Sequence, residues 1–339
     1  MPIDTGGGSS RKRLLRIAGT LISVGLLAYL FASQDRQEVF DGVRQMPAWV
    51  LAAVFALIVV SRFAVAARWY LVLRAMGVDI PLSTTLRLNF AGLYATNFLP
   101  STVGGDIVRL AGIIQLNHGG SKATASVLLD RIIGLLGMAT AVPLAIPALL
   151  GAGSGGASGA MSAGATVCMA GGLNGMTAKI KDVVHRVLQA FKLAAGNPVA
   201  LVLAFVMTYV HMLCMFMIVK LVLLGMGTPM SLWLAGGLWS LVYVVSLIPI
   251  SINSLGLQEL SISYAYSTLA AVPMAHALVM GLLVRLLMTV GSLPGVFFLP
   301  SVLSGGGVRE RLGRAVEGLG ASAEEPVSVA EGPSDGSSS

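Results

Sequence analysis

One segment of this sequence, Asn97–Arg109, interrupts an apolar chain with residues that an uninterrupted membrane helix does not tolerate. It contains a proline without a backbone donor, two permissive glycines and two charged side chains, namely Pro100, Gly104, Gly105, Asp106 and Arg109. At membrane depth, irregular backbone persists only where protein buries it or where it lines a watery cavity. The segment therefore predicts a broken helix beside a polar cavity.

A weaker version of the same pattern occurs late in the chain. Pro249–Glu259 again combines a proline, a glycine at Gly256 and an acidic residue between apolar segments. Two such breaks in one chain suggest that the protein is organised around the pair.

The composition places these breaks in an all-α polytopic membrane protein. Of 339 residues, 55% are hydrophobic and only 11% are charged, which is typical of several membrane helices. The two cysteines lie in apolar runs, so no disulfide framework is expected. The net charge of +7 comes from Lys and Arg scattered at segment ends, which argues against a nucleic-acid partner.

Apolar run lengths predict about six full spans and two re-entrant hairpins. The expected spans are 14–33, 48–73, 122–150, 160–175, 198–224 and 272–299. Each arm of the hairpins 83–118 and 231–271 is marginal for crossing the bilayer alone, because a span needs roughly 20 residues. Span, hairpin and span occur twice, in 48–150 and 198–299, which predicts an inverted repeat.

The remaining segments are short. We expect a cytoplasmic tail at 1–13, one membrane domain over 14–300 and a disordered cytoplasmic tail at 301–339. Within the domain, 177–195 has the pattern of a basic amphipathic helix on the membrane surface.

The distribution of basic residues sets the expected orientation. If both hairpins return to their own side, 16 of the 22 Lys and Arg, with Arg68 and Arg109 among them, fall on the cytoplasmic side. The external loops receive only Arg36 and Arg44, which is a strong positive-inside bias. We therefore expect a bacterial cytoplasmic-membrane protein with both termini inside.

Asp106 and Arg109 have two interpretations. Asp106 caps a helix that starts at Ile107 while Arg109 reaches the interface, or both face a ligand. Inside the third span, Asp130 and Arg131 point in different directions and so need separate partners. A helix-end role is slightly favoured for Asp130, whereas Arg131 lies deeper.

The second break has its own charged pair. Arg285 lies in the middle of a span, where a charge costs at least about 2.5–3.5 kcal/mol, so it needs Glu259 or an anionic ligand group. A purely structural pair remains the competing interpretation. Arg62 is a lesser candidate.

Motifs for other kinds of chemistry are missing from the sequence. There is no Walker lysine, nucleophile elbow or zincin pair, and the histidines His211 and His276 are isolated. We expect no cofactor, no metal and no enzymatic activity. An intramembrane acid–base enzyme using Asp106 or Glu259 is a third, weaker possibility.

These residues resemble the membrane domain of lysylphosphatidylglycerol synthases, a group of flippase-like proteins, over about residues 14–300. The first motif is Asn97-Phe98-Leu99-Pro100 with Gly104-Gly105-Asp106 and Arg109. The supporting motifs are Asp130-Arg131 with Gly134, Gly256-x-x-Glu259, and Arg285 with Pro294-Gly295. Gln258 departs from the basic residue that often precedes the glutamate in such proteins. The aminoacyl-transferring domain is not found in this sequence, so lysyl transfer is not implied.

The resemblance implies lipid handling. The first hypothesis is a flippase for an anionic or polar-headed lipid, with Arg109, Arg131 and Arg285 contacting the head group. The candidate substrate-binding set also includes Asn97, Pro100, Gly104, Gly105, Asp106, Gly256 and Glu259. The alternative is a non-transporting partner that presents lipid to a separate glycosyl- or aminoacyl-transferase. A homo-oligomer is also possible.

Overall fold

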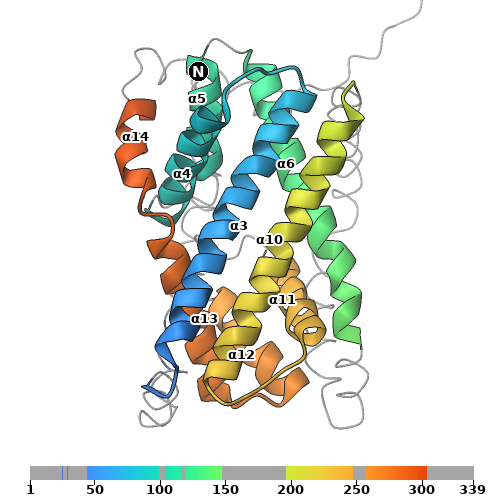
Figure 1. Cartoon of the computed structure of the whole chain (residues 1–339), viewed down its shortest axis with the longest axis vertical. Helices are drawn as coiled ribbons and strands as arrows, with labels where there is room; N and C mark the ends of the chain where they lie inside the picture. The colour runs from blue at the N-terminus through green and yellow to red at the C-terminus, as the bar shows by residue number, and fades with distance from the viewer. Residues whose placement is uncertain are drawn as a thin grey trace, which may run out of the picture.

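The structure is a computed structural model. It describes residues 25, 29, 44–98, 104–116, 119–146, 196–246 and 257–303. Every regular element in these ranges is helical, as expected (Figure 1). The expected spans 14–33 (apart from Gly25 and Tyr29) and 160–175, the surface helix 177–195 and the tail beyond residue 303 lie outside the described residues.

Two long helices form the centre of the fold. α3 (Ala48–Ala75) and α10 (Pro198–Gly225) contain 28 residues each, or about 42 Å, which exceeds the hydrocarbon thickness of about 30 Å. They pack against one another along their length and run in opposite directions along the long axis (Figure 1). Pro at the start of α10 suits the first helical turn, and Asn197 caps that helix through the amide of Ala200.

The two long helices end in the same turn. Gly77 and Gly227 follow them with φ of +67° and +77°, a left-handed conformation that favours glycine. The next amide then bonds back to the helix in both cases, from Val78 to Leu73 and from Thr228 to Leu223. These turns direct the chain into a short helix at opposite ends of the molecule.

At each end, two short helices follow the turn. α4 (Leu82–Phe98) and α5 (Gly104–Gln115) pack together at one end, and α11 (Leu232–Ser246) and α12 (Leu257–Ala270) lie at the other (Figure 1). The pairing of α4 with α5 depends on Gly105, because a Cβ there would lie 2.5 Å from the carbonyl oxygen of Gly92. The breaks between these short helices, expected at Pro100 and Gly256, lie outside the described residues.

Three described helices have the length and composition to cross a membrane, and a bent pair makes a possible fourth. The three are α3, α10 and the continuous segment Gly120–Ala145, which comprises α6 (Gly120–Ala141) and the 3-10 turn η1 (Val142–Ala145).

The span expected over 272–299 is broken in the structure. α13 (Met274–Val290) and α14 (Gly295–Leu303) are separate helices bent by 54°. Pro294 lacks the amide needed to continue α13. After the bend, α14 packs on α4, where Gly295 approaches the carbonyl of Phe90 too closely to admit a side chain.

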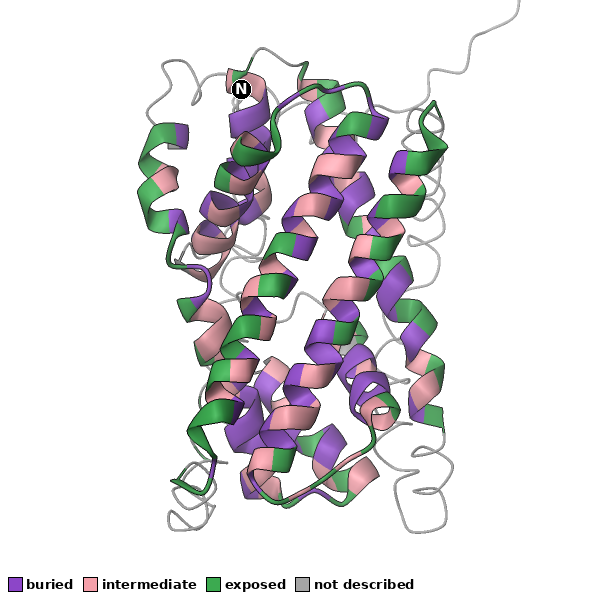
Figure 2. Cartoon of the chain, in the orientation of Figure 1, coloured by how far each residue is buried: buried purple, intermediate pink, exposed green. Residues whose placement is uncertain are grey.

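Burial divides the long helices into two faces (Figure 2). The inner faces form apolar clusters, the largest between α3, α10 and the elements 232–290. A second cluster joins α4 and α5 to the C-terminal part of α3 around Trp69. The outer faces carry exposed apolar side chains, including Phe63, Val202 and Phe297, as expected of a lipid-facing surface.

Candidate functional site

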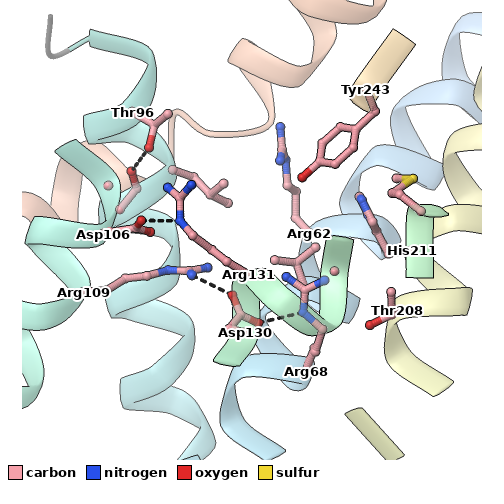
Figure 3. Close-up of a pocket in the computed structure, with 16 residues that line it drawn as sticks. Arg62, Arg68, Thr96, Asp106, Arg109, Asp130, Arg131, Thr208, His211 and Tyr243 are labelled. Carbon is pink, nitrogen blue, oxygen red and sulfur yellow. Dashed lines mark hydrogen bonds and ion pairs between the residues drawn. The ribbon is translucent and has the colours of Figure 1, made fainter. Parts of the chain in front are cut away.

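A polar cavity of about 270 Å³ lies between α3, α4, α5, α6, α10 and α11. Its lining includes four arginines and two aspartates, so these six side chains carry a formal charge of +2 (four minus two). We call it the arginine cavity; its charged residues are Arg62, Arg68, Arg109, Arg131, Asp106 and Asp130 (Figure 3).

Asp130 joins two of the cavity arginines. Its side chain is only 2% exposed, and its two oxygens bind different arginines. Arg68 Nε donates to Oδ1 at 2.7 Å, and Arg109 Nη1 donates to Oδ2 at 3.0 Å (Figure 3). One carboxylate therefore links α3, α5 and α6, and the expected helix-end role of Asp130 is wrong.

Arg109 makes two further contacts. Its second nitrogen donates to Asn89 of α4, and its guanidinium lies over the ring of Trp69, 4.8 Å from the centroid. Arg109 and Arg68 are both buried. The interpretation that Arg109 reaches the interface is therefore wrong, and neither residue belongs in a count of surface charges.

Arg131 points away from Asp130, as the sequence predicts for adjacent residues. Its Nε pairs with Asp106 across the cavity (Figure 3). The Arg131 side chain is 54% exposed and that of Asp106 is 19% exposed. Because α5 already begins at Gly104, Asp106 lies in its first turn and is not the N-cap that the sequence suggested.

Arg62 differs from the other three arginines. It lies midway along α3, and among the described residues it forms no ion pair. Its Nη2 donates to the carbonyl oxygen of Met288 at 3.2 Å and contacts the sulfur of that residue at 2.9 Å. Its Nε is buried without a hydrogen-bond partner. Arg62 is thus a cavity-lining charge satisfied only by neutral groups.

The neighbouring histidine does not suggest a metal site. His211 of α10 bonds to the Ser61 hydroxyl of α3 at 2.7 Å, at the midpoint of the two long helices. Within the described ranges, no three His, Cys, Asp or Glu side chains gather as metal ligands require.

A second, smaller cavity of about 140 Å³ lies at the other break and is called the Glu259 cavity. Glu259, 2% exposed and one of the two partners expected for Arg285, pairs with that arginine, and Gln258 also accepts from Arg285 at 3.2 Å. Asn97 lines this cavity and donates to Ser292 at 2.8 Å. The first break therefore contributes to the second cavity.

The predicted site residues thus divide between two cavities. Gly105, Asp106, Arg109 and Arg131 line the first, while Asn97, Glu259 and Arg285 line the second. Gly104 is buried at the start of α5, and Pro100 and Gly256 lie outside the described residues. Sequence reasoning missed Arg68, Trp69 and Asn89. The available signal was Arg68 itself, an arginine five residues before the end of the predicted span 48–73, but the charge count placed it on the cytoplasmic side.

The comparison with known families addresses the same part of the chain. The family model described as "Lysylphosphatidylglycerol synthase TM region" matches residues 16–295. The chain belongs to this family. The match contains every described helix that lines either cavity, and it confirms the resemblance drawn from the motifs. Membership in the lysylphosphatidylglycerol synthase TM region family indicates a multi-pass membrane domain in lipid-related processes. No curated protein matches the chain.

Proposed function

We propose that the protein moves an anionic-headed lipid between the leaflets of a bacterial cytoplasmic membrane. The observation that carries the proposal is a positively charged cavity between membrane helices, in which Arg62 has no described carboxylate partner. No chemical step is required of the protein, and the acyl chains remain in the bilayer.

The energetics favour an anionic ligand at this place. A charge near the bilayer centre costs at least about 2.5–3.5 kcal/mol, and intramembrane charges therefore pair or serve a function. Arg68 and Arg109 are engaged by Asp130, and Arg285 by Glu259, so the head group is assigned chiefly to Arg62 and the half-exposed Arg131. Arginine suits this role because its planar fork binds two phosphate oxygens.

The arrangement of helices supports movement between two sides. The units α3–α6 and α10–α13 follow the same order, share the same glycine turn and place their short helices at opposite ends of the molecule (Figure 1). We interpret them as the inverted repeat of an alternating-access carrier. In that arrangement both termini are cytoplasmic and the arginine cavity opens toward the cytoplasm.

Reconstituted protein tests the proposal. Proteoliposomes containing fluorescent phosphatidylglycerol are treated with dithionite, which bleaches only the outer leaflet. We expect bleaching beyond the outer-leaflet fraction with the protein and none beyond it in empty vesicles. If anionic lipids move no faster than in empty vesicles, translocation is refuted. A stoichiometric complex with a transferase, without lipid movement, would instead support the lipid-presenting alternative.

A further inference from the structure

Arg62 connects the linings of the two cavities through a contact between its charged side chain and a backbone carbonyl. It lines the arginine cavity, and its guanidinium binds Met288, which lines the Glu259 cavity. The acceptor is the main-chain carbonyl at 3.2 Å, joined by the thioether at 2.9 Å. A cation that faces one cavity therefore holds the wall of the other.

The contact falls on the last turn of α13, directly before the bend into α14. Here the carbonyls of Leu287, Thr289 and Val290 accept amides from residues 291–293. The carbonyl of Met288 instead accepts from Arg62. Carbonyls at a helix C-terminus attract cations, so the guanidinium is well placed, but its acceptors are neutral.

The chain also packs against α3 directly after this turn of α13. Ile58, one turn before Arg62, contacts Gly291, where a Cβ would lie 2.9 Å from the isoleucine methyl. Beyond Gly291 the chain bends by 54°. At the end of α13, next to this bend, both an apolar contact and a guanidinium of α3 therefore hold the chain.

We propose that Arg62 is a latch that couples head-group binding in the arginine cavity to opening of the Glu259 cavity. This inference rests on the proposed function, because it assumes an anionic head group. A phosphate oxygen offers Arg62 a charge-assisted hydrogen bond, which is roughly twice as strong as a bond between neutral groups. The anion therefore draws the guanidinium from Met288, and the released turn of α13 moves away from α3.

The same geometry assigns the latch a specificity. A zwitterionic head group brings its own cation and competes less well for Arg62 than a net-negative one. Opening should therefore respond to phosphatidylglycerol and not to phosphatidylcholine. The inference adds to the translocation proposal a named residue that connects the two cavities.

A thiol reporter in the Glu259 cavity tests the latch. Thr289 lines that cavity beside Met288, so T289C is introduced with Cys168 and Cys214 replaced by alanine. The protein is placed in phosphatidylcholine vesicles with or without phosphatidylglycerol, and labelling by a water-soluble maleimide is timed. With Arg62 present, we expect slow labelling in phosphatidylcholine and faster labelling when phosphatidylglycerol is included.

In the R62Q background the latch is absent. Labelling should be fast in both lipids. In phosphatidylcholine the labelling rate should be about tenfold higher than that of the parent, because the variant loses a hydrogen bond made by a charged group. M288L is the milder second variant, because it keeps the volume and the carbonyl but removes the thioether contact. It should give intermediate labelling in phosphatidylcholine, and so tests the latch if R62Q does not fold. R74Q, whose arginine is exposed at the end of α3, should label like the parent.

Two results would overturn the latch. One is labelling of T289C that neither R62Q nor M288L changes in phosphatidylcholine. The other is acceleration by phosphatidylglycerol that is equally large with and without Arg62. Phosphatidylglycerol bound to purified protein is quantified in parallel. If the protein binds or moves phosphatidylglycerol but T289C labelling does not depend on Arg62, only this inference is refuted. If R62Q and M288L speed the labelling but the protein moves no anionic lipid, only the proposed function is refuted.

Discussion

Neutralising Asp130 should damage this protein more than removing any exposed charge. In D130N the side-chain shape is retained, but Arg68 and Arg109 lose their shared carboxylate, to which they donate at 2.7 and 3.0 Å. All three side chains are buried, with exposures of 2% for Asp130 and 10% or less for the arginines. The variant therefore leaves two guanidinium groups in the interior with an amide in place of an anion.

The expected loss follows from this burial. Removing one partner of a buried ion pair costs about 3–5 kcal/mol, because the remaining charge is uncompensated. At about 2–4 °C per kcal/mol, the value for domains of 150–250 residues, the apparent melting temperature should fall by about 6–20 °C.

The assay is thermal stability of the purified protein in detergent, followed by fluorescence-detected size exclusion after heating. D79N is the matched control, since Asp79 pairs with Arg74 at 3.8 Å and both side chains are more than half exposed. Such a pair contributes about 0–1 kcal/mol, so D79N should melt close to the parent.

A compensating variant separates charge from shape. D130N combined with R68Q and R109Q removes all three charges and should recover much of the lost stability, because a neutral cluster leaves no buried ion unpaired. If D130N melts within error of D79N, or if the triple variant is worse than D130N, the account of Asp130 as a buried charge hub is refuted.

Three further predictions follow from particular contacts. G105A should prevent close packing of α4 and α5, because its Cβ would meet Gly92 and Thr96. G119A, which has open space around its Cβ, is the control and should express normally. Comparable yields of monodisperse protein from the two variants would contradict this prediction. E259Q and R285Q should each lower the melting temperature while the double variant recovers part of the loss, and a double-mutant cycle with no coupling would rule out an energetically important pair. R131Q should change stability by about 1 kcal/mol or less, because its pair with Asp106 is partly exposed, yet reduce retention of phosphatidylglycerol; unchanged retention would remove Arg131 from the site.

The sequence predicts the helices of this fold well where local physics determines them. Long apolar runs predicted α3 and α10 to within two residues at their C-terminal ends, and the structure adds the glycine turn that follows each one. The bend after α13 was missed although Pro294 is visible in the sequence, because a run of apolar residues on both sides resembled one span. Pro294 prevents α13 from continuing, and α14 then packs on α4, a tertiary contact that the sequence does not reveal.

The candidate site was predicted in its residue types more than in its pairs. Glu259 with Arg285 was expected from the cost of a lone mid-span charge. The cluster at Asp130 was not, because Arg68, Arg109 and Asp130 are 21 or more residues apart and nothing local indicates that one carboxylate joins them. Arg62 was a lesser candidate for the same reason. Its lack of a described carboxylate partner becomes visible only when the structure shows that Arg68, Arg109 and Arg131 each pair with an aspartate.

The most direct test of the central claim is the lipid that the cavity retains. Parent, R62Q and R74Q proteins are purified from mixed phosphatidylglycerol and phosphatidylcholine, and bound lipid is quantified by native mass spectrometry. We predict that the parent and R74Q retain phosphatidylglycerol in preference to phosphatidylcholine and that R62Q loses this preference. Equal retention of both lipids by the parent, or a preference that survives R62Q, would contradict an anion site at Arg62.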